Sequence, residues 1–207
     1  MNLISVYFPE LQHDRLVLLE KYAKLLIEWN AKINVISRKD IDSIEERHIL
    51  HSLSLVKLFS FSASSQIADV GSGGGFPGIP IAIFCPQIQV SLIESIRKKA
   101  NVLCDMVNAL GLTNVTVENV RTEDISKKYD FVIGRAVAAF PDFYNIVKHL
   151  VSLKSRNEFA NGILYLKGGD FSGELSGFSR AKIFSIQTVF SESYFETKKL
   201  IYLPFSR

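Results

Sequence analysis

The stretch DVGSGGGFPG at residues 69–78 decides the fold. Its first two residues end an apolar run, Ile67–Val70, and it leads into a second apolar run with Pro77 near its start. Glycines are required where a backbone turns tightly and approaches a bulky ligand, because a Cβ atom would collide or forbid the necessary φ angle. In an open α/β sheet, ligands bind outside the carboxyl ends of the strands. The stretch therefore predicts a strand, a ligand-binding turn and a helix, with a site for an adenine-containing cofactor.

The rest of the chain after residue 62 alternates between short apolar runs and helical patterns. The predicted strands are Ile67–Val70, Gln89–Ile93, Val115–Val120, Phe131–Ile133 and Ile163–Leu166, and the predicted helices are Pro77–Phe84, Lys98–Leu110 and Asp142–Leu153. This alternation indicates right-handed βαβ units and a parallel sheet. Two further runs, Ile183–Phe190 and Lys198–Leu203, predict an antiparallel pair at one edge. We expect an α/β, Rossmann-like, mostly parallel seven-stranded sheet with an antiparallel C-terminal edge, as in class I methyltransferases.

Residues 1–62 predict a helical extension, and residues 63–207 predict the cofactor-binding domain. An apolar stripe at helical spacing indicates a helix within residues 10–29. A turn-rich stretch follows, and a second helix is predicted over residues 40–59 with Asp40 as its N-cap. We expect this extension to pack near the carboxyl ends of the strands and to help close the pocket.

The composition indicates an ordinary globular protein. The chain has 207 residues, 47% of them hydrophobic, with a formal net charge of +3 and two cysteines, so neither a disulfide nor a metal site is expected. The apolar run Ile79–Pro86 is far shorter than the roughly 18 residues that span a bilayer. We therefore expect a cytoplasmic protein without membrane contact. The mild basic excess permits a nucleic-acid partner without requiring one.

Two acidic segments complete the predicted cofactor site. Glu94 ends the second predicted strand, where a carboxylate can accept hydrogen bonds from both ribose hydroxyls of a bound adenosine. Residues 121–124, with Thr122 and Glu123, follow the third strand at the place where an adenine ring would lie. Together with the glycine-rich turn, these two segments predict an adenosine site more strongly than any one of the three does alone.

Three kinds of nucleotide site compete for the glycine-rich turn. A P-loop fails, because Ile79 and Pro80 stand where Lys and Ser or Thr are required. A dinucleotide site, as in an NAD-dependent oxidoreductase, formally matches at residues 73–78. That register places the first glycine too far from the strand and a proline inside the turn. The register that begins at Asp69 and uses Gly71, Gly73 and Gly75 follows the strand directly and suits S-adenosylmethionine, which has no pyrophosphate.

The chain resembles the bacterial small-subunit ribosomal RNA methyltransferase G family, also called the glucose-inhibited division protein B family. The resemblance covers nearly the whole chain and rests on WNAKIN at 29–34, RHILHS at 47–52, DVGSGGGFPGIP at 69–80, RA at 135–136 and LKG at 166–168. It implies transfer of a methyl group from S-adenosylmethionine to N-7 of a guanine in the 530 loop of 16S ribosomal RNA. The implied partner is this RNA or the small ribosomal subunit, and we expect a monomer.

The resemblance also implies roles for individual residues. Gly71, Phe76, Thr122, Glu123 and Arg135 would contact the cofactor, with Glu94 at the ribose, while Asn34, Arg38, His48, Arg135 and Lys167 would line the RNA-facing side of the pocket. The family often has Asp where this chain has His51 and Glu94. No role is therefore assigned to His51, and the longer Glu94 side chain keeps the carboxylate.

Guanine N-7 carries a lone pair and no proton, so we expect no general base. The rate would then come from alignment and from a preorganised pocket. Arg135 and Lys167 are better suited to phosphate or carboxylate groups than to the purine, which gains positive charge. Two alternatives remain at this point, the NAD-dependent oxidoreductase and a non-catalytic RNA-binding module.

Overall fold

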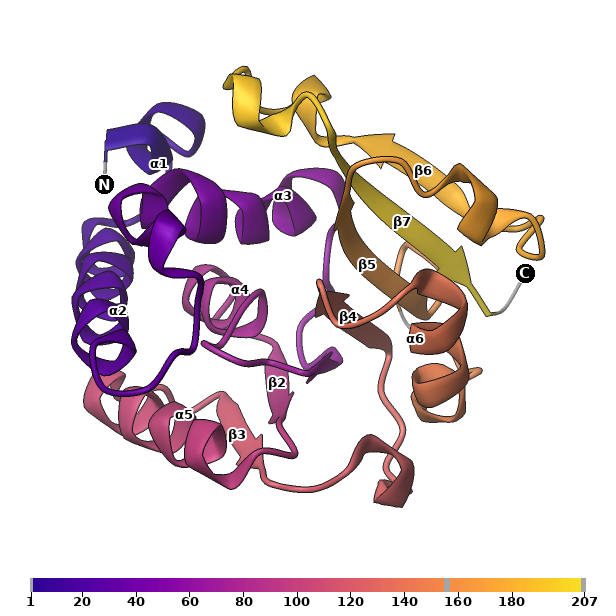
Figure 1. Ribbon diagram of the computed structural model, residues 1–207, viewed down its shortest axis with the longest axis horizontal. Coiled ribbons are helices and arrows are strands. Elements are labelled where there is room, and N and C mark those ends of the chain that lie inside the picture. Colours follow the sequence, from indigo (N-terminus) through magenta and orange to yellow (C-terminus); the bar gives the residue numbers. More distant parts are fainter. Residues whose placement is uncertain (1, 155–156, 206–207) are drawn as a thin grey trace.

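The computed structural model describes residues 2–154 and 157–205, and its centre is a seven-stranded sheet (Figure 1). The strands are β1 (Gln66–Val70), β2 (Gln89–Ile93), β3 (Val115–Glu118), β4 (Phe131–Arg135), β5 (Gly162–Gly168), β6 (Lys182–Ser185) and β7 (Lys198–Pro204). They lie in the order β3-β2-β1-β4-β5-β7-β6. β1 to β5 pair in parallel, and β7 pairs antiparallel with both β5 and β6. The predicted sheet is confirmed, including its antiparallel edge.

Helices cover both faces of this sheet. The α-helices are α1 (Asn2–Tyr7), α2 (His13–Asn30), α3 (His51–Leu58), α4 (Gly78–Phe84), α5 (Arg97–Leu110) and α6 (Phe140–Val147). Figure 1 shows α2 to α5 together on one side of the molecule and α6 on the opposite side. Successive residues of β1 point to opposite faces, so Ile67 belongs to the apolar cluster beneath α2 to α5 and Ala68 to the cluster beneath α6.

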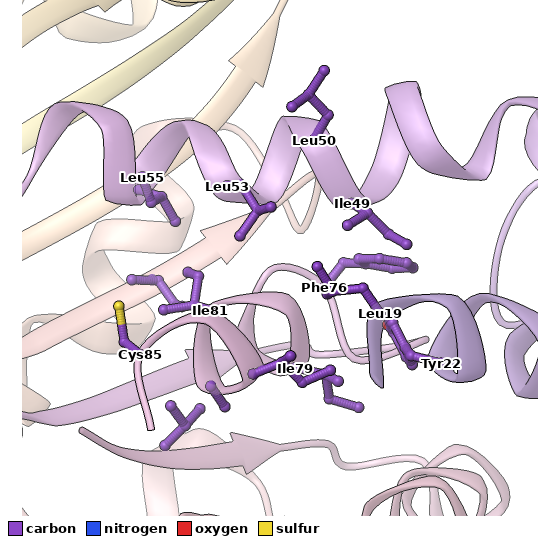
Figure 2. Packing of buried hydrophobic residues seen from close by; sticks show 14 of the residues in the cluster. Leu19, Tyr22, Ile49, Leu50, Leu53, Leu55, Phe76, Ile79, Ile81 and Cys85 are labelled. Atoms are coloured by element: carbon purple, nitrogen blue, oxygen red, sulfur yellow. The ribbon is translucent and has the colours of Figure 1, made fainter. Parts of the chain in front are cut away.

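The first two α-helices and α3 share one hydrophobic core with α4 and α5. α2 contacts both α4 and α5, and α3 packs along α4. In Figure 2, the side chains of Leu19 and Tyr22 of α2, of Ile49 just before α3 and of Leu53 in α3 converge on Phe76 and on the side chains of α4. The N-terminal helices therefore lie against the glycine-rich turn that precedes α4. The domain boundary near residue 62 remains a prediction.

The prediction of one α-helix over residues 40–59 is wrong. A 3-10 helix covers Arg38–Ser43, a π-helix covers Glu45–Leu50, and α3 then runs from His51 to Leu58. Asp40 is not an N-cap, because it lies inside the 3-10 helix and its Oδ1 accepts a hydrogen bond from Arg47 Nη1 at 2.8 Å. These helix types place apolar side chains at similar spacings, so periodicity alone does not separate them.

Other elements also differ from the prediction. α6 ends at Val147 and a 3-10 turn follows, because Val151 forms an extended bridge with Tyr129 instead of continuing the helix to 153. β6 ends at Ser185, since residues 186–188 form another 3-10 turn, so the predicted strand over 183–190 is too long. α1 was not predicted. Among the described residues, no helix is long and apolar enough to cross a membrane.

Candidate functional site

The glycine-rich turn leaves β1 in a conformation that side chains would obstruct. Gly71 has φ of +71°, and Gly75 has φ of +95° with its hypothetical Cβ inside the Ile79 side chain. Asp69, at 0% exposure, anchors the turn because its Oδ2 accepts the Gly78 N–H at 2.9 Å. Burial raises the pKa of Asp69 to about 7. These contacts define the shape of the turn, and the role of its residues toward a cofactor stays a prediction.

The N-terminal helices hold the outer side of the turn. The Tyr22 hydroxyl of α2 donates a 2.7 Å hydrogen bond to the Gly74 carbonyl. At the end of the same helix, the buried Asn30 side chain accepts the backbone N–H groups of Val35 at 2.8 Å and Ile36 at 3.0 Å. Because Val35 and Ile36 line the pocket described below, the extension both supports the turn and forms part of the pocket wall.

Glu94 lies directly beside the turn, just beyond the end of β2. Its carboxylate is 5% exposed and accepts the backbone N–H groups of Gly73 at 3.1 Å and Ile96 at 2.9 Å. A carboxylate has about four acceptor positions, so positions remain for further donors. Thr122 is buried and Glu123 is exposed in a 3-10 turn after β3, and neither they nor Glu94 line the pocket described next.

A pocket of about 550 Å³ opens at the carboxyl edge of the parallel strands. Its wall comes from residues 35–37 and Asp40, from Arg47, His48 and His51, from the turn at 71–74 with Phe76, from 135–138, from 165–168, and from Tyr194 and Lys198. The structure thus brings together His48, Gly71, Gly73, Phe76, Arg135 and Lys167 as predicted. It leaves Asn34 exposed outside this wall, and the side chain of Arg38 lies outside the described part of the chain.

Arg135 at the end of β4 is the central cation of the pocket. Its guanidinium donates to the Arg47 carbonyl at 3.2 Å and to His48 Nδ1 at 2.7 Å, and it lies 4.8 Å from the centre of the Phe76 ring. Within the described residues no carboxylate lies within 4 Å of it. Burial lowers the pKa of Arg135. A guanidinium that is largely buried without a carboxylate is suited to bind an anionic group.

The two histidines of the pocket are neutral. Since a guanidinium only donates, His48 Nδ1 must accept, and the ring proton is on Nε2. Burial, aided by the charge of Arg135, lowers the pKa of His48 to about 3. The same two causes lower the pKa of His51, which packs on the rings of Tyr194 and Phe195. Neither ring is therefore a proton acceptor of useful strength near neutral pH.

Lys167 reaches the pocket from β5 but is not free. Its ammonium group forms an ion pair with Glu174, and that carboxylate also accepts the backbone N–H of Phe140 at 2.6 Å. A phosphate that binds Lys167 must therefore compete with Glu174.

Several pocket residues were missed by the sequence reasoning, notably Tyr165, Val137, Tyr194 and Lys198. One signal could have revealed Lys198. It begins an antiparallel strand, and the amino end of such a strand lies at the carboxyl edge of its parallel neighbours.

Comparison with known proteins identifies the family. The model of the GidB family, described as rRNA small subunit methyltransferase G, matches residues 15–200. The chain belongs to this family. The protein named ribosomal RNA small subunit methyltransferase G from Christiangramia forsetii is 50% identical, covering 99% of this chain and 97% of the relative. The protein of the same name from Bacteroides thetaiotaomicron is 43% identical, covering 98% of each chain.

Solved structures agree on the fold. A SAM-dependent methyltransferase from Aquifex aeolicus superposes with a TM-score of 0.56 at 16% identity, covering 81% of this chain and 97% of the other. The predicted family and the class I methyltransferase fold are confirmed, and with them the enzyme class, an S-adenosylmethionine-dependent methyltransferase of ribosomal RNA. The family leaves no support for an NAD-dependent oxidoreductase.

Proposed function

We propose that this chain transfers a methyl group from S-adenosylmethionine to N-7 of a guanine in the 530 loop of 16S ribosomal RNA. The supporting observation is that neither histidine of the pocket is suited to remove a proton. His48 has a pKa of about 3 and its Nδ1 is already occupied by Arg135, while the Asp40 carboxylate is paired with Arg47 at 2.8 Å. A nitrogen with a free lone pair needs no base, whereas an amino group or a hydroxyl does.

The residues around the turn fit the cofactor. When bound, S-adenosylmethionine supplies a methyl group on a sulfonium, which an in-line nucleophile displaces. Gly71 and Gly73 leave backbone exposed at the end of β1, and the Glu94 carboxylate beside them has acceptor positions left for ribose hydroxyls. Thr122 and Glu123, in the 3-10 turn after β3, would border the adenine.

Arg135 would bind the carboxylate of the cofactor's amino-acid end or a phosphate of the RNA. Both groups match a guanidinium that lacks a carboxylate partner. Asn34, Arg38 and Lys167 would contact the RNA around Arg135. Lys167 would break its ion pair with Glu174 in order to bind a phosphate. Because the reacting purine gains positive charge, these cations should contact the RNA backbone. The purine ring itself should contact His48 and the apolar wall of the pocket.

The test is methyl transfer by the purified full chain. Small ribosomal subunits and naked 16S RNA from a strain without this enzyme are incubated with radiolabelled S-adenosylmethionine, and the modified nucleotide is mapped. We expect incorporation at a single guanine, detected by the chain cleavage to which N-7-methylguanine is prone. Labelling at an amino group or a ribose hydroxyl would contradict the base-free mechanism. RNA binding without incorporation would indicate the non-catalytic module.

We further infer that the enzyme acts as a monomer in the cytoplasm, where bacterial small subunits are assembled. Light scattering of the purified chain, alone and with the cofactor, tests the monomer. A stable dimer would contradict it.

A further inference from the structure

The loop between β4 and α6, residues 136–139, forms the pocket wall that faces the glycine-rich turn. Ala136 has φ of +54°, a conformation that is unfavourable for any residue other than glycine. The next side chain, Val137, is 39% exposed and lies over Gly71, so that a Cβ on that glycine would be 3.0 Å from Val137 Cγ2. This loop therefore presents an apolar side chain to the pocket, directly over the glycine-rich turn.

One hydroxyl holds this loop in place. The Tyr165 oxygen accepts the backbone N–H groups of Val137 at 2.9 Å and Ala138 at 3.0 Å, and it donates to the Ala138 carbonyl at 2.8 Å. A phenolic hydroxyl has one proton to donate and accepts two such bonds, so its capacity is used in full. The Tyr165 hydroxyl thus holds the backbone directly after the strained residue Ala136.

The Tyr165 ring is itself fixed in the core. It is fully buried on β5 and stacks on Phe143 of α6, with ring centres 4.4 Å apart and an interplanar angle of 25°. Gly134 of β4 leaves room for this stack, because a Cβ there would lie 2.6 Å from the Phe143 ring. The hydroxyl cannot shift without disturbing α6, so the ring acts as a rigid support for the loop.

We propose that Tyr165 is a positioning residue for methyl transfer, whose hydroxyl sets the 136–139 loop so that Val137 aligns the target base with the methyl group. This inference rests on the proposed function. The loop is one wall of the pocket, while the ribose would be held on the other side of the turn by Glu94. Loss of the hydroxyl should therefore disturb the alignment of the base more than the binding of the cofactor.

The test compares Tyr165→Phe with Tyr202→Phe. Tyr202 lies on β7, its hydroxyl donates to the Ala160 carbonyl at 2.6 Å, and it does not line this pocket, so the control loses a tyrosine hydroxyl with one hydrogen bond where Tyr165 has three. Displacing a reacting group by about 1 Å can cost on the order of 100-fold in rate. We expect kcat on small subunits to fall about 10- to 100-fold in Tyr165→Phe, with the Kd for S-adenosylhomocysteine within about threefold of wild type. Amide exchange of Val137 and Ala138 should accelerate in this variant alone.

A second variant, Val137→Ala, keeps every backbone hydrogen bond of the loop and shortens the side chain over Gly71. It should lower kcat in the same direction without faster amide exchange, and it remains informative if Tyr165→Phe does not fold. Full kcat in either folded variant would overturn the proposal. A fall in kcat of the same size in Tyr202→Phe would also overturn it, since the effect would then be general. Absence of transfer by the wild-type enzyme would instead contradict the proposed function before any variant is measured.

Discussion

The Glu94 carboxylate gives the sharpest test of the cofactor site, through the substitution Glu94→Gln. The amide keeps the shape of the side chain but offers one acceptor oxygen in place of two. In the structure both carboxylate oxygens are used, one by the Gly73 N–H and the other by the Ile96 N–H. The amide must therefore direct its NH₂ group at one backbone donor, and a ribose hydroxyl that donates to this side would also lose its acceptor.

The expected size of the effect follows from these bonds. A hydrogen bond to a charged group contributes about 1.5–3 kcal/mol, so losing one ribose bond should weaken cofactor binding about 10- to 150-fold. Losing one backbone bond to the buried carboxylate should cost a similar amount of folding free energy. For a chain of this length that corresponds to a fall in Tm of about 3–12 °C.

The assay is calorimetric titration with S-adenosylhomocysteine, together with thermal unfolding of the ligand-free protein. Glu94→Asp keeps the charge on a shorter side chain and should lose less affinity than Glu94→Gln. Glu118→Gln is the matched control, because Glu118 also ends a strand but accepts the Tyr129 hydroxyl at 3.1 Å. If Glu94→Gln binds the ligand within twofold of wild type, the ribose contact does not exist and the proposed cofactor geometry is wrong.

Three other substitutions test the neighbouring parts. Tyr22→Phe leaves the Gly74 carbonyl unpaired and should cost about 1–3 kcal/mol of unfolding free energy in urea, with weaker cofactor binding. His48 has a pKa of about 3 in the folded protein and near 6.5 in the unfolded chain, so only the unfolded chain binds a proton between these values. The free energy of unfolding therefore decreases as the pH falls below about 6.5. Between pH 6.5 and 5.5, the free energy of unfolding should decrease by about 1 kcal/mol less in His48→Gln than in the wild type. An equal decrease in both proteins would contradict the lowered pKa of His48. Lys167→Ala should reduce the salt slope of RNA binding by about 1 if the lysine contacts a phosphate.

The fold was predictable because its signals are local. Short segments of sequence were enough to predict the strand before Gly71, the helix after it and the alternation of strands and helices that follows. The structure confirms all three. The prediction of a single α-helix before Phe59 was wrong because 3-10, π and α turns place apolar residues at similar spacings. The choice between them depends on tertiary contacts such as the pair formed by Asp40 and Arg47.

The site divides in the same way. The turn and Glu94 lie at predictable ends of strands, so they could be found from the sequence. Tyr165 and Tyr194 are brought to the pocket by strand order and by the connections between strands, which no single window contains. The roles assigned to individual site residues, Glu94 and Arg135 as much as Thr122, remain predictions.

The contact between Tyr22 and the Gly74 carbonyl has a consequence for how the protein is made. α2 packs on α4 and α5, and α5 ends at residue 110, so the N-terminal helices leave the ribosome long before their packing partners exist. Most of the stability of a helix in a protein comes from the packing of its apolar face. The first helices should therefore become ordered only when the nascent chain extends well past the turn. For the same reason, a fragment starting after residue 62 would lack the side chain that supports its own turn, and the whole chain is the practical unit for expression.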